Sequence, residues 1–245
     1  MHKEDDDKDR LIRQLERENE QKTKWLSLIA HDLRGTLANV RWLLTAYEEK
    51  SLTPEVIEGF LPEIHREIEM NEKMLEDTFS WVNQQLQGFR AKHTKVVIKE
   101  SLREIESRLE DIVAAKKIQI NSFVKEEVYL LTDPILFSFI LKKCLENAVK
   151  YSYEYGEINV DVKEEKGNIE ICIQDYGMGM SSPTLERIFS MDKSPFTGPE
   201  GEKGRGLSMV IVQGFVRDLQ GSIQVTSDLE EETQVLLRFP IREKR

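Results

Sequence analysis

The stretch Ala30-His31-Asp32-Leu33-Arg34-Gly35-Thr36-Leu37 lies inside a long segment, Asp9–Glu48, that contains no proline and a single glycine. Apolar positions recur through this segment at intervals of four and three residues, as in Trp25, Ile29, Leu33, Thr36, Val40, Leu44 and Tyr47. Leu11 and Leu15 extend the pattern toward the N-terminus. This spacing predicts a long helix with one apolar seam.

A second seam follows, made of Ile57, Leu61, Ile64, Ile68, Leu75, Phe79, Val82 and Leu86. Thr53-Pro54 suits the N-cap and first turn of this second helix, whereas Pro62 predicts a kink or a later start. Two helices joined by a short turn form an antiparallel hairpin with too little core of its own. We therefore expect residues 1–90 to form the helical hairpin of a homodimer, a dimeric four-helix bundle with a coiled-coil lead-in.

The pattern becomes mixed after a linker at Gly88–Thr94, which predicts an α+β sandwich domain over residues 91–245. A β-hairpin is predicted where Ile158, Val160 and Val162 face Ile169, Ile171 and Ile173 across Lys166-Gly167-Asn168. The other predicted elements are helices at Ser101–Lys116, from Asp133-Pro134 to about Lys150 and at Leu207–Leu219, and strands at Ile118–Val124, Val128–Leu131, Ile223–Thr226 and Val235–Phe239.

Composition excludes several classes of function. The 245 residues carry a net charge of −10, which argues against nucleic-acid binding because phosphate contacts need clustered Lys and Arg. No apolar run approaches the length of a membrane span and no signal peptide is visible, so we expect a soluble cytoplasmic chain without membrane contact. Cys144 and Cys172 lie in apolar patterns and are predicted to be buried thiols.

His31 is the candidate reactive residue. At about 100° per residue it lies roughly opposite the seam at Ile29 and Leu33, so it points away from its own hairpin. A histidine can accept a phosphoryl group, and the neighbouring Asp32 can take its proton or orient its ring. The alternative is an ordinary solvated histidine beside an aspartate.

Three later segments carry the features of a nucleotide site. Lys143, Asn147, Lys150 and Glu154 share one helix face, opposite an apolar face, and an asparagine oxygen can bind Mg²⁺. Asp175-Tyr176-Gly177-Met178-Gly179 follows a strand, where glycines permit close approach of a flat ligand and a buried carboxylate can accept a bond from an amine. Gly201–Leu207 precedes a helix, a setting that favours phosphate. An amphipathic helix and a tight turn are the alternatives for the first two segments.

Together these segments resemble the sensor histidine kinases of two-component signalling, over about Leu26–Phe239. The motifs are a phosphoacceptor box at His31-Asp32-Leu33-Arg34, an asparagine box at Leu145–Tyr151, and glycine boxes at Asp175-x-Gly177-x-Gly179 and Gly204-Arg205-Gly206-Leu207, with Phe196 in a predicted lid at Ile188–Pro199.

The resemblance implies a Bergerat-type ATP-binding fold in the C-terminal half, with ATP and Mg²⁺ as cofactors. It implies that Asn147 holds Mg²⁺ and that Asp175 accepts a bond from the adenine amine. The implied activity is autophosphorylation of His31, assisted by Asp32, followed by transfer to an aspartate on the receiver domain of a response regulator. The implied nucleotide-binding residues are Asn147, Lys150, Tyr151, Asp175, Gly177, Gly179, Phe196, Gly204, Gly206 and Leu207.

Some positions depart from the family pattern. Gly35 and Thr36 stand where the family often has a water-positioning residue and a proline, which makes phosphatase activity doubtful. Lys143 replaces a second asparagine, and Ser208 follows the second glycine box where glycine is usual. These departures leave two alternatives, a dimeric nucleotide-binding scaffold without turnover and a hydrolytic ATPase of the same superfamily. Outward-facing Trp42 lines either a regulator-docking patch or a contact with the partner hairpin.

Overall fold

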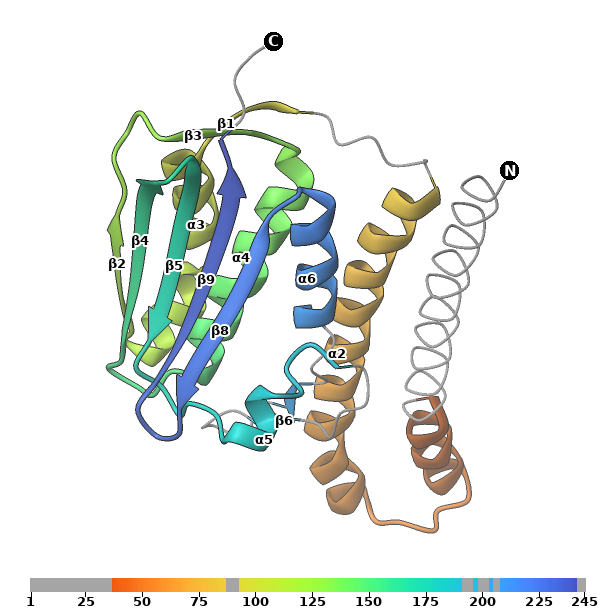
Figure 1. Ribbon diagram of the computed structural model, residues 1–245. Coiled ribbons are helices and arrows are strands. Elements are labelled where there is room, and N and C mark those ends of the chain that lie inside the picture. The colour runs from red at the N-terminus through yellow and green to blue at the C-terminus, as the bar shows by residue number, and fades with distance from the viewer. Residues whose placement is uncertain (1–36, 87–92, 191–195, 198–202, 205–207, 242–245) are drawn as a thin grey trace. The chain divides into compact units, whose positions relative to one another are not determined.

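The computed structural model describes residues 37–86, 93–190, 196–197, 203–204 and 208–241. The chain divides into two compact units, Met1–Gly88 and Phe89–Arg245 (Figure 1). His31, Asp32 and the rest of the predicted phosphoacceptor box up to Thr36 lie outside the described residues.

The described part of the N-terminal unit contains a helix over residues 37–48 and helix α2 (Pro54–Leu86). The first helix ends near Lys50, whose φ of 54° lets Ser51 N–H donate to the Ala46 carbonyl at 3.0 Å. The Lys50 N–H also donates to the Tyr47 carbonyl at 3.2 Å, and these two hydrogen bonds form a Schellman motif, which ends the helix without a glycine. The Trp42 ring then meets Phe60 of α2 edge to face, with ring centroids 5.6 Å apart.

The apolar seam of the first helix is only partly covered within a single chain. Leu43 and Ala46 are buried, whereas Leu44 and Tyr47 of the predicted seam are 58% and 65% exposed. Periodicity gives the direction of an apolar stripe on a helix and not what covers it.

Helix α2 begins at Pro54, as the sequence predicted, and continues across Pro62. The alternative of a late start is wrong. A proline in a helix interior removes one backbone hydrogen bond, because Pro62 has no N–H to donate to the carbonyl four residues earlier.

A five-stranded sheet forms one layer of the C-terminal unit (Figure 1). Its strand order is β2 (Gln119–Phe123), β4 (Glu157–Glu165), β5 (Asn168–Asp175), β9 (Glu232–Pro240) and β8 (Ser222–Asp228). In this sheet β2 and β4 are parallel, and the other neighbouring strands are antiparallel. The predicted hairpin is confirmed, with Val160 opposite Ile173 and Val162 opposite Ile171.

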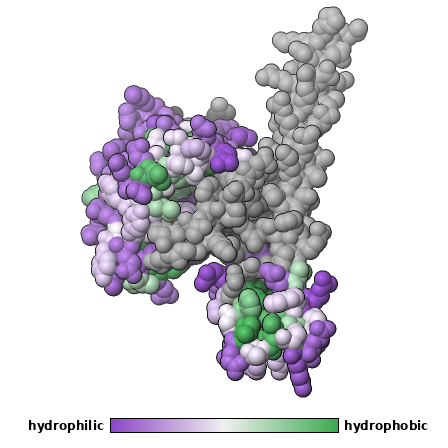
Figure 2. All heavy atoms as spheres, turned by 90° about the horizontal axis from the view of Figure 1, so that it is seen from below, coloured by the Kyte–Doolittle hydropathy of each residue, from purple (hydrophilic) through white to green (hydrophobic). Residues whose placement is uncertain are grey.

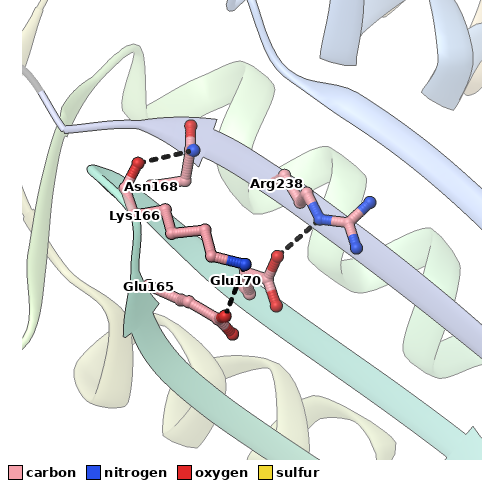
Figure 3. Close-up of polar contacts among 5 residues, drawn as sticks. All are labelled: Glu165, Lys166, Asn168, Glu170 and Arg238. Carbon is pink, nitrogen blue, oxygen red and sulfur yellow. Dashed lines mark hydrogen bonds and ion pairs between the residues drawn. The ribbon is translucent and has the colours of Figure 1, made fainter.

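The turn of that hairpin consists of Lys166 and Gly167, both with positive φ, the geometry that matches the natural twist of two strands. Figure 3 shows the polar contacts around it: Lys166 pairs with Glu165 at 3.3 Å, and Asn168 Nδ2 donates to the Lys166 carbonyl. On the neighbouring strand Arg238 pairs with Glu170 across β5 and β9. This face of the sheet is therefore polar.

Helices α3 (Ile98–Lys116), α4 (Pro134–Tyr151) and α6 (Ser208–Asp218) cover the other face of the sheet (Figure 1). Aromatic rings join these elements: Phe137 of α4 meets Phe239 of β9 between the layers, and Phe139 of α4 meets Phe215 of α6 within the helical layer. Cys144 lies in this core, while Cys172 is only half-buried. The core thus holds α4, and the chain that follows its C-terminal end, against the sheet.

Several short elements were not predicted. Strand β1 (Thr94–Val97), of which only Thr94 lies in the predicted linker, pairs antiparallel with β3 (Tyr129–Thr132), and α3 begins three residues earlier than expected. A single turn of helix, α5 (Ser182–Leu185), precedes the predicted lid, and strand β6 (Phe196–Thr197) lies within it and pairs with β7 (Lys203–Gly204). Within the described ranges, no helix has the length and apolar character needed to cross a membrane.

Candidate functional site

Strand β5 ends at Asp175, a carboxyl that is only 5% exposed. Burial raises its pKa to about 7 from the ordinary value of 3.8; the Gly177 hydrogen bond acts in the opposite direction, and the charge of Glu232 adds to the rise. The Gly177 N–H donates to Asp175 Oδ1 at 3.2 Å. A buried carboxylate has further acceptor capacity, so a ligand with an amine donor would suit this position.

Gly177 is required by the protein's own backbone. A Cβ at this position would lie 2.2 Å from the carbonyl oxygen of Tyr151, the last residue of α4. The same carbonyl accepts a hydrogen bond from Met178 N–H at 3.1 Å. The loop after β5 is therefore fastened directly to the C-terminal end of α4.

Gly179 fastens the other side of the loop. Its φ is +56°, and a Cβ would lie 1.9 Å from the Asp228 carbonyl at the end of β8. The Glu230 N–H donates to the Met178 carbonyl at 2.9 Å. The sequence analysis predicted that these glycines allow a ligand to approach the backbone closely. In the structure their immediate neighbours are protein backbone atoms, and this packing positions Asp175 before any ligand binds.

Helix α4 carries the predicted asparagine box. Its N-terminus is capped as predicted, because Asp133 accepts bonds from the N–H groups of Ile135 and Leu136. Asn147 is half-buried in the second half of the helix. Lys150 follows it in the last turn, with its ammonium 5.0 Å from the Tyr151 ring centroid. Because the end of α4 holds the loop after β5, the asparagine box and Asp175 belong to one corner of the unit.

The predicted polar stripe on α4 is only partly correct. Lys143 is buried, and its ammonium donates to Glu146 at 3.0 Å and lies 5.6 Å from the Phe139 ring centroid. Glu154 is exposed and lies beyond the helix end at Tyr151. Periodicity placed Lys143 on a polar face because it cannot show that a neighbouring layer covers that position.

A residue that the sequence analysis missed lies at the same corner. Lys116, the last residue of α3, is 5% exposed, and its ammonium donates to three carbonyls at the end of α4: Val149 at 3.4 Å, Lys150 at 2.9 Å and Ser152 at 3.3 Å. In the sequence, Lys116-Lys117 is typical of a basic helix end. No pattern in the sequence separates the buried lysine from the one beside it.

The second glycine box lies mostly outside the described residues. Gly204 is described and pairs with Phe196 in the β6–β7 ribbon, but Gly206 and Leu207 are not. Helix α6 begins immediately after them, at Ser208, close to the predicted Leu207 start. Its packing on α4 through Phe215 and Phe139 places these two helices side by side.

The polar groups of this corner fit a purine nucleotide better than a metal centre formed by the protein alone. In the described part of the chain, no three His, Cys, Asp or Glu side chains gather as metal ligands. Mg²⁺ bound with a nucleotide typically needs only one or two protein oxygens, with phosphate and water supplying the rest. Asn147 can offer one such oxygen, and Asp175 can receive an amine.

Comparison with known proteins agrees with this geometry. Residues 132–243 match the family described as histidine kinase-, DNA gyrase B- and HSP90-like ATPases. The chain is similar to the sensor histidine kinase YvrG of Bacillus subtilis, at 24% identity over 88% of this chain. It spans less than two fifths of the length of the curated kinases compared, 38% in the case of YvrG.

Solved structures give the same fold. The histidine kinase AdeS of Acinetobacter baumannii matches with a TM-score of 0.67 at 18% identity, covering 87% of this chain and 98% of AdeS. The histidine kinase ThkA, solved with its response regulator TrrA, matches with a TM-score of 0.68 at 17% identity, covering 89% of this chain and 62% of that one. Residues 132–243, just under half of the chain, are therefore similar to this ATPase family, and the C-terminal unit has the fold of the solved histidine kinase catalytic domains.

Proposed function

We propose that the chain is a histidine autokinase that transfers the γ-phosphoryl group of ATP to His31 and then to an aspartate of a response regulator. In this proposal Asp32 orients the imidazole or takes its proton. Transfer from ATP depends mainly on positioning and on charge stabilisation by Mg²⁺, which the asparagine oxygen of Asn147 would help to hold. We assign phosphoacceptor and dimerisation roles to residues 1–90 and catalysis to residues 91–245.

The observation that carries the proposal is the buried Asp175 carboxyl at the end of β5. Its raised pKa reflects the cost of keeping a charge away from water, and a hydrogen-bonding amine on a ligand would offset that cost. The surrounding loop is already fixed by Tyr151 and by the β8–β9 turn. Such a preorganised acceptor supports recognition of the adenine amine.

The surface of the N-terminal unit supports a homodimer. Figure 2 shows apolar side chains gathered on the described part of this unit, surrounded by hydrophilic ones. The exposed apolar residues of its two helices are Leu37, Trp42, Leu44, Tyr47, Val56, Phe60, Leu61 and Ile68. A second hairpin would cover this surface and complete a four-helix bundle, as the stripe through Leu44 and Tyr47 predicts.

A response-regulator receiver domain is the proposed partner for the second transfer. Support comes from the likeness to the kinase ThkA, which was solved with the regulator TrrA. Gly35 and Thr36 keep phosphatase activity toward that partner doubtful, and the proposal is limited to the forward transfer.

The proposal is tested by incubating the protein with Mg-ATP and analysing any phosphoryl group bound to it. We expect a group that is labile in acid and stable in base, as phosphohistidine is, and that is absent from His31→Ala. The matched control is His65→Ala, which removes an exposed histidine of α2 and should label normally. Labelling that persists in His31→Ala would refute the assignment.

A nucleotide-binding scaffold without turnover is the second candidate, and Lys143 favours it. Its ammonium is held by Glu146 within the protein, at the position where the family resemblance places a second asparagine. A cation there cannot bind Mg²⁺. ATP binding without phosphohistidine, in wild-type protein, would select this candidate.

A further inference from the structure

Lys116 accounts for carbonyl groups that the end of a helix normally leaves without partners. The carbonyls of residues 149, 150 and 152 accept bonds from its ammonium, and the carbonyl of residue 151 accepts the Met178 N–H. One residue further back, the Ala148 carbonyl accepts from both Ser152 N–H and Ser152 Oγ. The four successive carbonyls from 149 to 152 thus accept bonds either from one lysine or from the loop that follows Asp175.

The charge of Lys116 suits this position. A helix C-terminus carries partial negative charge, so an ammonium buried there is stabilised by the helix dipole as well as by its three acceptors. Without the ammonium, three carbonyls in a largely buried corner would lose their partner. The chain at 149–152 would then have to turn toward water, and the Tyr151 carbonyl would move with it.

That movement would reach Asp175 by a short path. Gly177 is in contact with the Tyr151 carbonyl, and Met178 donates to it at 3.1 Å, while Gly177 N–H also holds the Asp175 carboxyl at 3.2 Å. A shift of the helix end therefore displaces the loop that aims the carboxyl.

We propose that Lys116 is a positioning residue for adenine recognition: it holds the end of α4 so that the Tyr151 carbonyl seats the loop that aims Asp175. This inference rests on the proposed ATP site. It assigns to α3, which carries none of the nucleotide-binding motifs, a defined part in base selectivity.

The test compares the affinities of the full chain for ATP and GTP, by calorimetry, in wild type, Lys116→Met and Lys117→Met. Guanine presents a carbonyl where adenine presents its amine, so a guanine bound in the same orientation offers no amine to the aimed Asp175 carboxyl. Lys117 is the matched control, because its ammonium donates to the exposed Tyr155 hydroxyl instead. We expect Lys116→Met to weaken ATP binding roughly tenfold or more while GTP binding changes little, since small misplacements of an aiming group have effects of this size.

Equal losses for ATP and GTP, or unchanged ATP affinity in folded Lys116→Met, would overturn the inference while leaving the proposed function intact. A wild-type protein that binds no ATP would refute both the inference about Lys116 and the proposed function. Hydrogen exchange over residues 176–180 gives a second readout, with the Ile171 region of β5 as reference, and should accelerate in Lys116→Met.

If Lys116→Met does not fold, Lys116→Arg decides the question. A planar guanidinium cannot aim donors at three carbonyls arranged around one point. The preference of Lys116→Arg for ATP over GTP should therefore be smaller than that of wild type, and hydrogen exchange at residues 176–180 should be faster. Wild-type selectivity and exchange in Lys116→Arg would overturn the inference.

Discussion

The variant Asp175→Asn should change the stability of the C-terminal unit and its affinity for ATP in opposite directions. The folded protein raises the pKa of this carboxyl from 3.8 to about 7, mainly through burial. The folded state therefore holds this proton more tightly than the unfolded chain does. The contribution of Asp175 to stability is fully favourable below about pH 4, falls as the pH rises from about 4 to 7, and reaches its full penalty above about pH 7.

The size of this penalty follows from the shift. A pKa difference from 3.8 to about 7 corresponds to about 4 kcal/mol at roughly 1.4 kcal/mol per unit, and little of it is screened because the side chain is 5% exposed. Asparagine keeps the shape of the side chain and an acceptor oxygen for the Gly177 N–H, but it cannot ionise. We expect Asp175→Asn to raise the free energy of unfolding by up to about 4 kcal/mol near pH 8, relative to its effect near pH 4.

Urea unfolding followed by far-ultraviolet circular dichroism measures this difference. Tryptophan fluorescence would report on the other unit, because Trp25, Trp42 and Trp81 all lie within residues 1–88. The same variant should lose affinity for ATP, since a neutral amide is a weaker acceptor for an amine. An equal change in stability at both pH values would refute the reasoning about burial.

Three further predictions follow from individual contacts. Gly179→Ala should destabilise the C-terminal unit severely, because its Cβ would lie 1.9 Å from a backbone oxygen, whereas Gly167→Ala, with a similar positive φ but open space, should cost only about 1 kcal/mol, as chemical denaturation can measure. Glu232→Gln should lower the pKa of Asp175, so the pH below which ATP affinity declines should move down; an unmoved pH profile would contradict this. Trp42→Ala should impair transfer to the regulator while sparing autophosphorylation if the docking interpretation is correct, and equal loss of both would favour a packing role, measured with labelled phosphoryl transfer.

Local patterns predicted most of the elements. Alternating apolar residues indicated the β4–β5 hairpin and its turn, and Asp133-Pro134 indicated the start of α4. These features depend on neighbours a few residues away, which the sequence shows directly. Strand β1 was missed because four residues are too few to show a period, and the parallel β2–β4 pairing joins segments distant in the chain.

Sequence motifs indicated which residues belong to the candidate site, but not what surrounds those residues in the fold. The sequence pointed to Asp175, Gly177 and Gly179, but it could not show that Tyr151 and the end of β8 press against the two glycines. Burial of Lys116 and Lys143 depends on the layers packed over them, so both looked like ordinary charged helix residues. A similar limit applies to the apolar stripe of the first helix, which is clear in the sequence although what covers it is not.

The fate of the γ-phosphoryl group in a single turnover tests the central proposal most directly. Protein in excess over γ-labelled Mg-ATP should retain the label on the wild-type chain, with little free phosphate released, and His31→Ala should retain none. Release of free phosphate at the same rate from wild type and His31→Ala, with no label on either chain, would contradict the account and identify a hydrolytic ATPase.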